Sequence, residues 1–513
     1  MAPPRHTTLA FLALLAACAA APLGGPAAPP LINDLRVEGL VAPLAAPPRP
    51  RFSWRATGAQ RSYRLTVTQT YPTTNVAWDS GVVNSSASWL VPCGADLPAD
   101  SDFTWTVALE LAGSGAASAS APLSTAPRAA PAGAWLGFAD TLRGALALSP
   151  APVARARLLA TGVGCYEARV NGARVSAALA PGFGHAPSAR ALYDTYDVAA
   201  ALQPGGENVV GVRVGSCKWG AFGQYCAGGA AACNAAWAAL VVDQGGNVTT
   251  LVTSGGAAWR AANTSVLYQH LWNGELYDAR LEQPGWAEPH FANASAWAPA
   301  TPVDTADRIG PLLPALAPPV ALGAPLTPAS VTAVPGAAFV FDLGANIAGF
   351  CGLDLAPPAG EARVAAGAAL SLLHGELLHP NGTVYNHYLP PGGTHQPGGL
   401  NQPQMNYSYV TRGADELMHG PHFSFFGFRF IELRGWPYAA PPAPAALTCS
   451  FIHTDLPATG TVSFPGQPAL DALQNATVRT HLSNYVRFNV HNAAPATATL
   501  TTLTPNSMRA PRP

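Results

Sequence analysis

Short runs in which apolar and polar residues alternate recur along most of the chain. Between residues 30 and 126 they include YRLTVTQ and FTWTVALEL, each followed by a polar turn. Alternation with a period of two is typical of half-buried β-strands, because successive side chains point to opposite faces. This first block therefore predicts a small β-sandwich of about a hundred residues.

Two further blocks show the same alternation. Residues 135–300 contain RARLLATG, CYEARVNGARV, ENVVGVRVG and WAALVVD, and residues 315–450 contain AAFVFDLG, FSFFGFRFIELRG and ALTCSFIH. Proline-rich stretches separate the blocks, at STAPRAAPAGAW and PLLPALAPPVALGAPLTP. Asn171-Gly172 lies between two alternating runs and predicts a type I′ hairpin turn, in which both central residues need positive φ.

A helical pattern is expected only near the end of the chain. It begins near Pro468 and continues through LQNATVRTHLSNYV, after which alanine, proline and threonine follow with no period. The sequence contains no dinucleotide fingerprint, P-loop, GxSxG elbow or HExxH motif. The predicted fold class is all-β, with tandem β-sandwiches, one C-terminal helix and an irregular tail.

Charge and composition exclude some classes of partner and indicate a compartment. With 27 Lys+Arg against 28 Asp+Glu, no net field favours nucleic acid or an anionic membrane. Residues 1–25 have a basic start, an apolar stretch and small residues, which predicts a secretory signal peptide; a bacterial lipoprotein box ending at Cys18 is the alternative. No later segment is apolar and long enough to span a membrane. We therefore expect a secreted, extracellular protein.

Sequons and cysteines agree with that compartment. N-x-S/T sequons occur at seven positions: Asn84, Asn247, Asn263, Asn293, Asn381, Asn406 and Asn475. Removal of the signal leaves seven of the eight cysteines. Cys217, Cys226 and Cys233 cluster, so two of them can pair across a loop in an oxidising compartment; buried thiols are the alternative.

Several strings resemble bacterial-type α-L-rhamnosidases, glycoside hydrolase family 78. RVEGLVAPLAAPPRPRFSWR at 36–55 resembles their fibronectin-like domain, and CYEARVNGARV and NGELYDARLEQPGW, up to residue 286, resemble their galactose-binding-type jelly roll. FVFDLGANIAGF and FSFFGFRFIELRGWP are similar to the β-supersandwich that follows, and residues 451–486 to the linker and first helix of the catalytic barrel.

The resemblance implies a domain order and an activity. The expected parts are a signal peptide (1–25), a fibronectin type III-like sandwich (30–126), a jelly roll (135–300), a concanavalin-like β-supersandwich (315–450), a linker with the first barrel helix (451–486) and an unstructured tail (487–513). Family members hydrolyse terminal α-L-rhamnose with inversion and need no cofactor. In the family, the two catalytic carboxyls lie in the (α/α)6 barrel. This sequence departs from the family pattern after Val486. No catalytic residue is therefore expected here, and the chain is predicted inactive alone.

The β domains can still bind rhamnose-containing glycosides or polysaccharides. By resemblance to calcium-dependent rhamnose-binding modules, oxygen ligands for sugar or calcium would come from Asn171, Asn273, Glu275 and Asp278, and ring faces from Trp219, Tyr225 and Trp272. A jelly roll without ligand is the alternative, as is a structural turn in which Arg280 pairs with a carboxylate.

A secreted, non-catalytic, rhamnose-binding β protein is the alternative function. Such a protein would have to cover the surfaces that face the barrel in the family. FSFFGFRF carries five aromatic residues in eight, and the sequence predicts an exposed apolar patch there.

Overall fold

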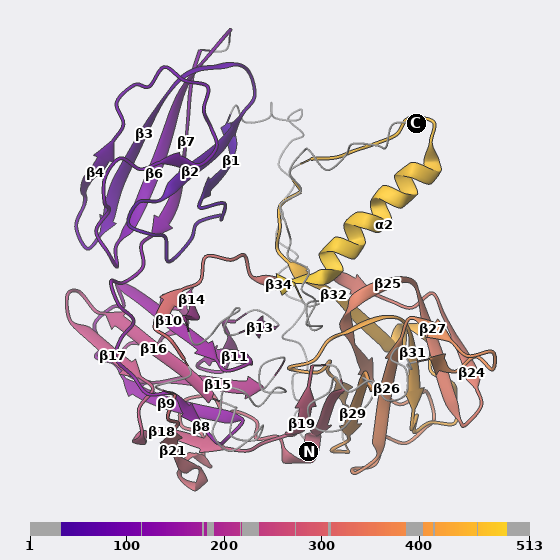
Figure 1. Ribbon diagram of the computed structural model, residues 1–513. Helices are drawn as coiled ribbons and strands as arrows, with labels where there is room; N and C mark the ends of the chain where they lie inside the picture. The colour runs from indigo at the N-terminus through magenta and orange to yellow at the C-terminus, as the bar shows by residue number, and fades with distance from the viewer. Residues whose placement is uncertain are drawn as a thin grey trace, which may run out of the picture. The chain divides into compact units, whose positions relative to one another are not determined.

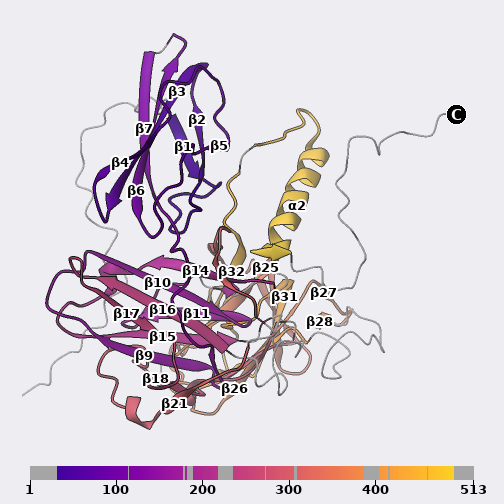
Figure 2. The same cartoon turned by 60° about the vertical axis from the view of Figure 1, so that its left-hand side comes forward.

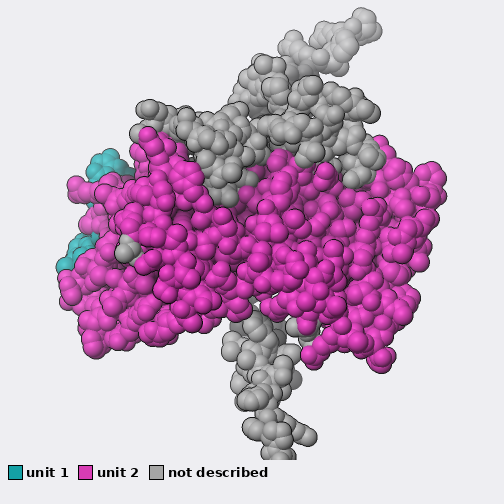
Figure 3. Space-filling model, turned by 90° about the horizontal axis from the view of Figure 1, so that it is seen from below, with its two compact units in different colours: residues 1–42, 49–97, 101–123 teal, residues 43–48, 98–100, 124–513 magenta. Residues whose placement is uncertain are grey.

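The computed structural model describes residues 32–489, except residues 114, 177–178, 182–188, 216, 218–234, 272, 306–308, 386–403, 414–415 and 459. The predicted signal peptide and residues 490–513 of the predicted tail lie outside the described residues. The chain divides into two compact units (Figure 3). Unit 1 comprises the chain up to Ala42, Arg49–Leu97 and Ser101–Leu123; unit 2 comprises Pro43–Pro48, Pro98–Asp100 and the chain from Ser124 onward.

Unit 1 is the β-sandwich that the first block predicts. One sheet contains β1 (Ile32–Val37), β2 (Arg51–Ala56) and β5 (Val91–Pro92); the other contains β4 (Asn75–Asp79), β3 (Gln60–Tyr71), β6 (Asp102–Leu111) and β7 (Gly115–Ser124). Alternate residues of β6, namely Phe103, Trp105 and Val107, are buried. The period-two pattern therefore identified the face of β6 that points to the core.

A thirteen-stranded sheet forms the first part of unit 2 and folds around one apolar core. Its members are β8 (Leu136–Gly137), β9 (Thr141–Ala147), β10 (Arg155–Gly162), β11 (Cys165–Val170), β12 (Ala173–Arg174), β13 (Ala180–Pro181), β14 (Ala191–Asp197), β15 (Glu207–Gly215), β16 (Ala235–Asp243), β17 (Val248–Val252), β18 (Gly256–Ala262), β21 (Ala298–Pro302) and β22 (Leu312–Pro314). Figure 2 shows β10 beside β16 and β15 beside β9, as their pairings require. The predicted hairpin is confirmed, since Asn171 and Gly172 join β11 to β12 with φ of 47° and 84°.

A ten-stranded sheet forms the second part of unit 2 (Figure 1). Its members are β19 (Val266–His270), β20 (Gly274–Asp278), β23 (Val320–Leu326), β24 (Ser330–Val334), β25 (Ala338–Asp354), β26 (Ala369–Gly375), β29 (Asn406–Val410), β30 (Leu417–Met418), β31 (Phe426–Arg434) and β32 (Leu447–Thr454). Two short strands, β27 (Leu377–Leu378) and β28 (Val384–Tyr385), pair separately.

Strands β19 and β20 lie in the part of the sequence expected to form the jelly roll, but they pair within the ten-stranded sheet. β20, with the string NGELYDAR, runs parallel to β29. Gly274 permits this pairing: its φ is 107°, and a Cβ there would lie 1.8 Å from the Asn406 carbonyl oxygen. A residue without a side chain is therefore required where β20 begins.

The aromatic run FSFFGFRF does not form the predicted exposed patch. Phe423, Phe426 and Phe428 are at most 3% exposed, and Phe425 and Phe430 are partly buried. Phe426 and Phe428 pack in the core of the ten-stranded sheet, and Phe423 packs beside the Cys165–Cys217 disulfide. Unit 2 itself thus buries three of these rings and partly covers the other two, without a further partner.

The predicted helix is confirmed as α2 (Pro468–Asn484), and none of its residues is buried. The chain then forms a small ribbon from β33 (Tyr485–Val486) and β34 (Phe488–Asn489), which corrects the predicted start of the tail at residue 487. Arg487, at φ 63°, makes two hydrogen bonds to the Asp194 carboxylate, at 2.7 and 2.5 Å. Val486 is buried in the same region. Docking on β14 therefore orders residues that have no regular sequence pattern.

Two disulfides lie among the described residues of unit 2. Cys217 pairs with Cys165, and Cys351 pairs with Cys449 across β25 and β32. A pair within the predicted cysteine cluster would therefore join Cys226 to Cys233. Cys226 and Cys233 lie outside the described residues. Within the part of the chain that the structure describes, no helix has the length and apolar character needed to cross a bilayer.

Removal of the Cys351–Cys449 disulfide is expected to destabilise unit 2. The bond closes a loop of 98 residues, and loss of such a crosslink typically costs about 2–5 kcal/mol of unfolding free energy. The double variant Cys351→Ala/Cys449→Ala should therefore unfold at lower denaturant, followed by intrinsic fluorescence. Cys93→Ala, at the free buried cysteine of unit 1, should leave that transition in place. An unchanged midpoint in the double variant would contradict the prediction.

Candidate functional site

Strand β20 carries two of the predicted site residues on different faces. Side chains alternate along a strand, so Glu275 and Tyr277 point to one face and Leu276 and Asp278 to the other. The first face contacts residues 422–423 through Glu275 and the core of the ten-stranded sheet through Tyr277. The second face, at Leu276, lines an open groove. The two faces have different chemistry.

Glu275 is 2% exposed and hydrogen-bonded to the backbone that precedes β31. Both of its carboxylate oxygens accept from the His422 N–H at 3.0 Å, and Oε2 also accepts from the Phe423 N–H at 3.0 Å. Burial raises the pKa of Glu275 to about 7, although these two N–H groups partly oppose the shift. The carboxyl therefore ties β20 to residues 422–423.

His422 continues the network into the thirteen-stranded sheet. Its Nε2 lies 3.1 Å from a guanidinium nitrogen of Arg213, and its Nδ1 lies 3.1 Å from Oε2 of Glu167. A guanidinium can only donate, so Nε2 accepts and Nδ1 carries the proton that is donated to Glu167. Burial, with the charge of Arg213, lowers the pKa of His422 to about 3. The imidazole is thus neutral near pH 7.

Glu167, on β11, is the anionic end of this network. Burial opposes its ionisation, but the hydrogen bond from His422 and the charges of Arg174 and Arg213 lower its pKa well below the usual range. The Arg169 Nε also donates to it at 2.6 Å. Glu167 therefore remains ionised in the interior.

We call Glu167, Arg213, Glu275 and His422 the buried polar joint. It connects β11 and β15 of the thirteen-stranded sheet to β20 of the ten-stranded sheet. Every carboxylate oxygen in it faces a protein donor, and the side chains of Glu167 and Glu275 are at most 2% exposed. This arrangement holds two β layers together and binds its carboxylate oxygens to protein donors.

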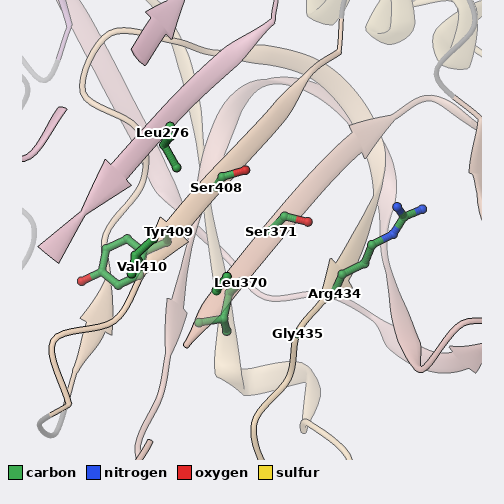
Figure 4. A pocket seen from close by; sticks show the side chains of 9 residues that line it. Leu276, Leu370, Ser371, Ser408, Tyr409, Val410, Arg434 and Gly435 are labelled. Atoms are coloured by element: carbon green, nitrogen blue, oxygen red, sulfur yellow. The ribbon is translucent and has the colours of Figure 1, made fainter. Parts of the chain in front are cut away.

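The opposite face of β20 lines an open groove of about 330 Å3 on the outer face of the ten-stranded sheet. Leu276, Ser408, Ser371 and Arg434 face one another across β20, β29, β26 and β31. Figure 4 shows the two serine hydroxyls on neighbouring strands, with Leu276 and Arg434 at either end of the row. Hydroxyls, a guanidinium and aliphatic side chains together suit a polar ligand with an apolar face.

The structure places the predicted ligand residues in separate environments. Asp278 is held by Arg280, whose Nε and Nη2 donate at 2.9 and 2.8 Å, as the structural-turn alternative expects. The Asn171 amide donates to the Ala201 carbonyl and accepts from the Val209 N–H, both at 2.8 Å, so it braces the hairpin. Trp219, Tyr225 and Trp272 lie outside the described residues.

These placements do not fit a shared calcium site. Asn171 is in a hairpin of the thirteen-stranded sheet, and Glu275 and Asp278 point to opposite faces of β20. Of the four oxygen-bearing candidates, only Asn273 has a buried side-chain oxygen without a hydrogen-bond partner. Among the described residues, no group of three or more His, Cys, Asp or Glu could hold a metal ion.

Sequence reasoning missed three members of the joint: Glu167, Arg213 and His422. Glu167 and His422 are 255 residues apart, and no motif spacing relates the three residues. The available signal was Glu167 itself, because a carboxylate inside the apolar run CYEARV needs a partner when buried.

Replacement of Glu275 by glutamine should change how stability depends on pH. The folded-state pKa of Glu275, about 7, lies above its ordinary value of 4.5. The contribution of Glu275 to the unfolding free energy is therefore fully present below pH 4.5 and is lost as pH rises through 7. The loss amounts to up to about 3 kcal/mol. Relative to Glu275→Gln, wild-type unit 2 should lose unfolding free energy over this window in urea titrations.

Asp278→Asn is the matched control on the same strand. The Arg280 hydrogen bond lowers the pKa of Asp278, so its contribution is present above the ordinary pKa and is lost as pH falls. The two variants should therefore differ from wild type with opposite pH dependence. Parallel profiles for wild type and Glu275→Gln would contradict the assignment for Glu275.

Comparison with known proteins identifies the domains. Residues 32–126 match the Rha78A-like N-terminal immunoglobulin domain, residues 151–322 the α-L-rhamnosidase N-terminal domain, and residues 332–453 the bacterial α-L-rhamnosidase concanavalin-like domain. An α-L-rhamnosidase of Streptomyces avermitilis is 32% identical over 322 residues, which cover 63% of this chain and 29% of that protein. One from an Alteromonas species is 25% identical over 458 residues, covering 82% and 47%.

Solved structures show the same fold. The α-L-rhamnosidase of Streptomyces avermitilis in complex with L-rhamnose superimposes with a TM-score of 0.74 at 22% identity, over 90% of this chain and 61% of that one. The Aspergillus terreus enzyme gives 0.74 at 23% identity, over 89% and 53%. The chain thus spans less than half of these curated relatives and between half and two thirds of the solved chains. By its three consecutive β domains, the chain belongs to the bacterial α-L-rhamnosidase family.

Proposed function

We propose that this chain is the β-domain part of an α-L-rhamnosidase, which releases terminal non-reducing α-L-rhamnose from glycosides with inversion. We further propose that these 513 residues do not perform the hydrolysis alone. The three matched domains and the relatives' names support the first statement. The second rests on one observation, the state of the buried carboxyls.

An inverting glycosidase needs two carboxyls roughly 6.5–9.5 Å apart, one as general acid and one as general base for water, with the sugar between them. The buried carboxyls of the joint bind backbone and side-chain donors instead. Several other carboxylates among the described residues of unit 2 are paired with arginines: Asp194 with Arg487, Asp278 with Arg280, Glu282 with Arg412, Asp342 with Arg429 and Glu432 with Arg434. An ion pair stabilises the ionised form, which opposes the role of general acid.

A non-catalytic rhamnose-binding protein is the second candidate, favoured by the groove in Figure 4. Its row of Leu276, Ser408, Ser371 and Arg434 offers an aliphatic contact for the C5 methyl group of a 6-deoxy sugar. The hydroxyls and the guanidinium offer hydrogen bonds for the ring hydroxyls. The two functions are compatible, since a binding surface can serve a hydrolase.

Secretion is part of the proposal. The disulfides Cys165–Cys217 and Cys351–Cys449 suit an oxidising compartment. Six of the seven sequon asparagines are exposed: Asn84, Asn247, Asn263, Asn293, Asn381 and Asn475. Asn406 differs, because it lies half-buried in β29 and its Nδ2 donates to Ser408 Oγ at 2.9 Å.

The purified 513-residue chain should release no nitrophenol from p-nitrophenyl α-L-rhamnoside. The physical reason is that, among the described residues, the buried carboxyls of the joint are bound by protein donors and not arranged around a sugar. Absorbance at fixed enzyme concentration, with the Streptomyces avermitilis relative as the positive control, measures this directly. Turnover above the protein-free blank, retained through further purification, would overturn the second statement.

Glycan occupancy should follow exposure when the chain is secreted from a eukaryotic host. We expect glycans at the six exposed sequons and none at Asn406, because a glycan on its Nδ2 would disrupt the packing of β29 between β20 and β26. Peptide mass spectrometry after enzymatic deglycosylation in heavy-oxygen water measures the glycan occupancy of each sequon. A fully occupied Asn406 in the folded, secreted protein would contradict the placement of that strand.

A further inference from the structure

Unit 2 contains a second cavity, of about 240 Å3, on the outer face of the thirteen-stranded sheet. Its wall is built from β10, β14, β16 and β17, together with segments 43–48, 98–100 and the chain after Ser124. The lining residues that carry the argument are Asp100, Arg155, Arg157, Leu159, Thr195 and Val241. None of them belongs to the buried polar joint or to the groove on the ten-stranded sheet.

Two nearly buried arginines form one side of this cavity. The side chains of Arg155 and Arg157 alternate with inward-facing residues along β10 and are 7% and 8% exposed. Arg155 pairs with Asp100 and Arg157 with Asp197, both at 2.8 Å, and these two aspartates are about half exposed. Each guanidinium is thus compensated by a carboxylate, so the cavity presents donors and acceptors together with little net charge.

The Thr195 hydroxyl provides an independent observation. Thr195 lies on β14 directly across from Leu159, and its Oγ1 is buried without a hydrogen-bond partner. Buried hydroxyls in native proteins are nearly always hydrogen-bonded, to protein, water or ligand. A cavity lined by this hydroxyl is therefore a place where a polar molecule gains a hydrogen bond that the protein leaves open.

Apolar side chains complete the wall. Leu159 and Val241 stand beside the arginines, and Leu44, Pro127 and Pro131 come from the covering segments. The volume lies below the roughly 300–1,000 Å3 of pockets for drug-sized ligands, which limits the occupant to a small molecule. Hydroxyl groups need both donors and acceptors, whereas C–H faces need apolar contacts.

We propose that this cavity binds a single neutral pyranose residue, with ring hydroxyls on the Arg–Asp pairs and Thr195 and a C–H face on Leu159 and Val241. An anion is disfavoured because both guanidiniums already face aspartates. This site goes beyond the proposed function: it is a sugar-binding site that is separate from hydrolysis and from the groove lined by Ser371. It remains whether or not the chain has rhamnosidase activity.

Ligand-observed NMR and calorimetry with the full chain test this proposal, with L-rhamnose, D-galactose and D-glucose as neutral probes and D-galacturonate as the anionic one. Saturable binding of a neutral sugar is expected. Thr195→Val, which removes only the hydroxyl, should weaken it about five- to ten-fold. Arg157→Lys keeps the charge but loses the planar fork, and should weaken it further. Thr332→Val, the matched change at an exposed position of β24, should not change it. Ser371→Ala reports separately on binding in the groove of the ten-stranded sheet.

The overturning outcomes are specific. If none of the three neutral sugars shows saturable binding, the proposed site is contradicted. Binding that is unchanged in both Thr195→Val and Arg157→Lys, or lost in Ser371→Ala, places the sugar elsewhere. Tighter binding of D-galacturonate than of the neutral sugars replaces the ligand class by an acidic sugar. Unfolding curves of each variant separate loss of binding from loss of fold, and the nitrophenol assay tests the proposed function independently.

Discussion

The carboxylate of Glu275, bound by the backbone N–H groups of His422 and Phe423, is the interaction on which the arrangement of unit 2 depends. A buried carboxylate without such donors would cost several kcal/mol. The network therefore requires residues 422–423 to lie against β20. His422 then bridges to Glu167 and Arg213 on the thirteen-stranded sheet, so that two β layers share one set of hydrogen bonds.

This use of charge explains how a protein with only 11% charged residues holds large β layers in register. Many charged side chains of unit 2 form ion pairs with one another, such as Asp278 with Arg280 and Asp194 with Arg487. Pairs of this kind position strands and turns, and they hold carboxylates ionised. A carboxylate held ionised in this way is poorly suited to donate a proton, whereas its oxygens can still accept hydrogen bonds.

Two hollows in the described part of unit 2 combine polar groups with aliphatic side chains. The groove beside Leu276 presents hydroxyls on an open sheet face, whereas the cavity beside Thr195 encloses compensated ion pairs and an unpartnered hydroxyl. Both combine hydrogen-bonding groups with aliphatic walls, which is the chemistry of a sugar ring. They lie on different sheets, so their contributions to glycan binding are separable by mutation.

Local patterns in the sequence determined the strands of each block, the Asn171-Gly172 hairpin, helix α2 and the resemblance to the α-L-rhamnosidases. These features depend on period, turn residues and short strings, all of which are visible within ten to twenty residues. Tertiary structure alone decided that β20 joins the ten-stranded sheet, that Cys217 pairs with Cys165 and that the aromatic run FSFFGFRF is covered. It also decided which partners Glu275 has. Alternation shows that a strand has two faces, but it does not show which distant segment packs against each face. His422, the partner of Glu275, lies 147 residues further along the chain.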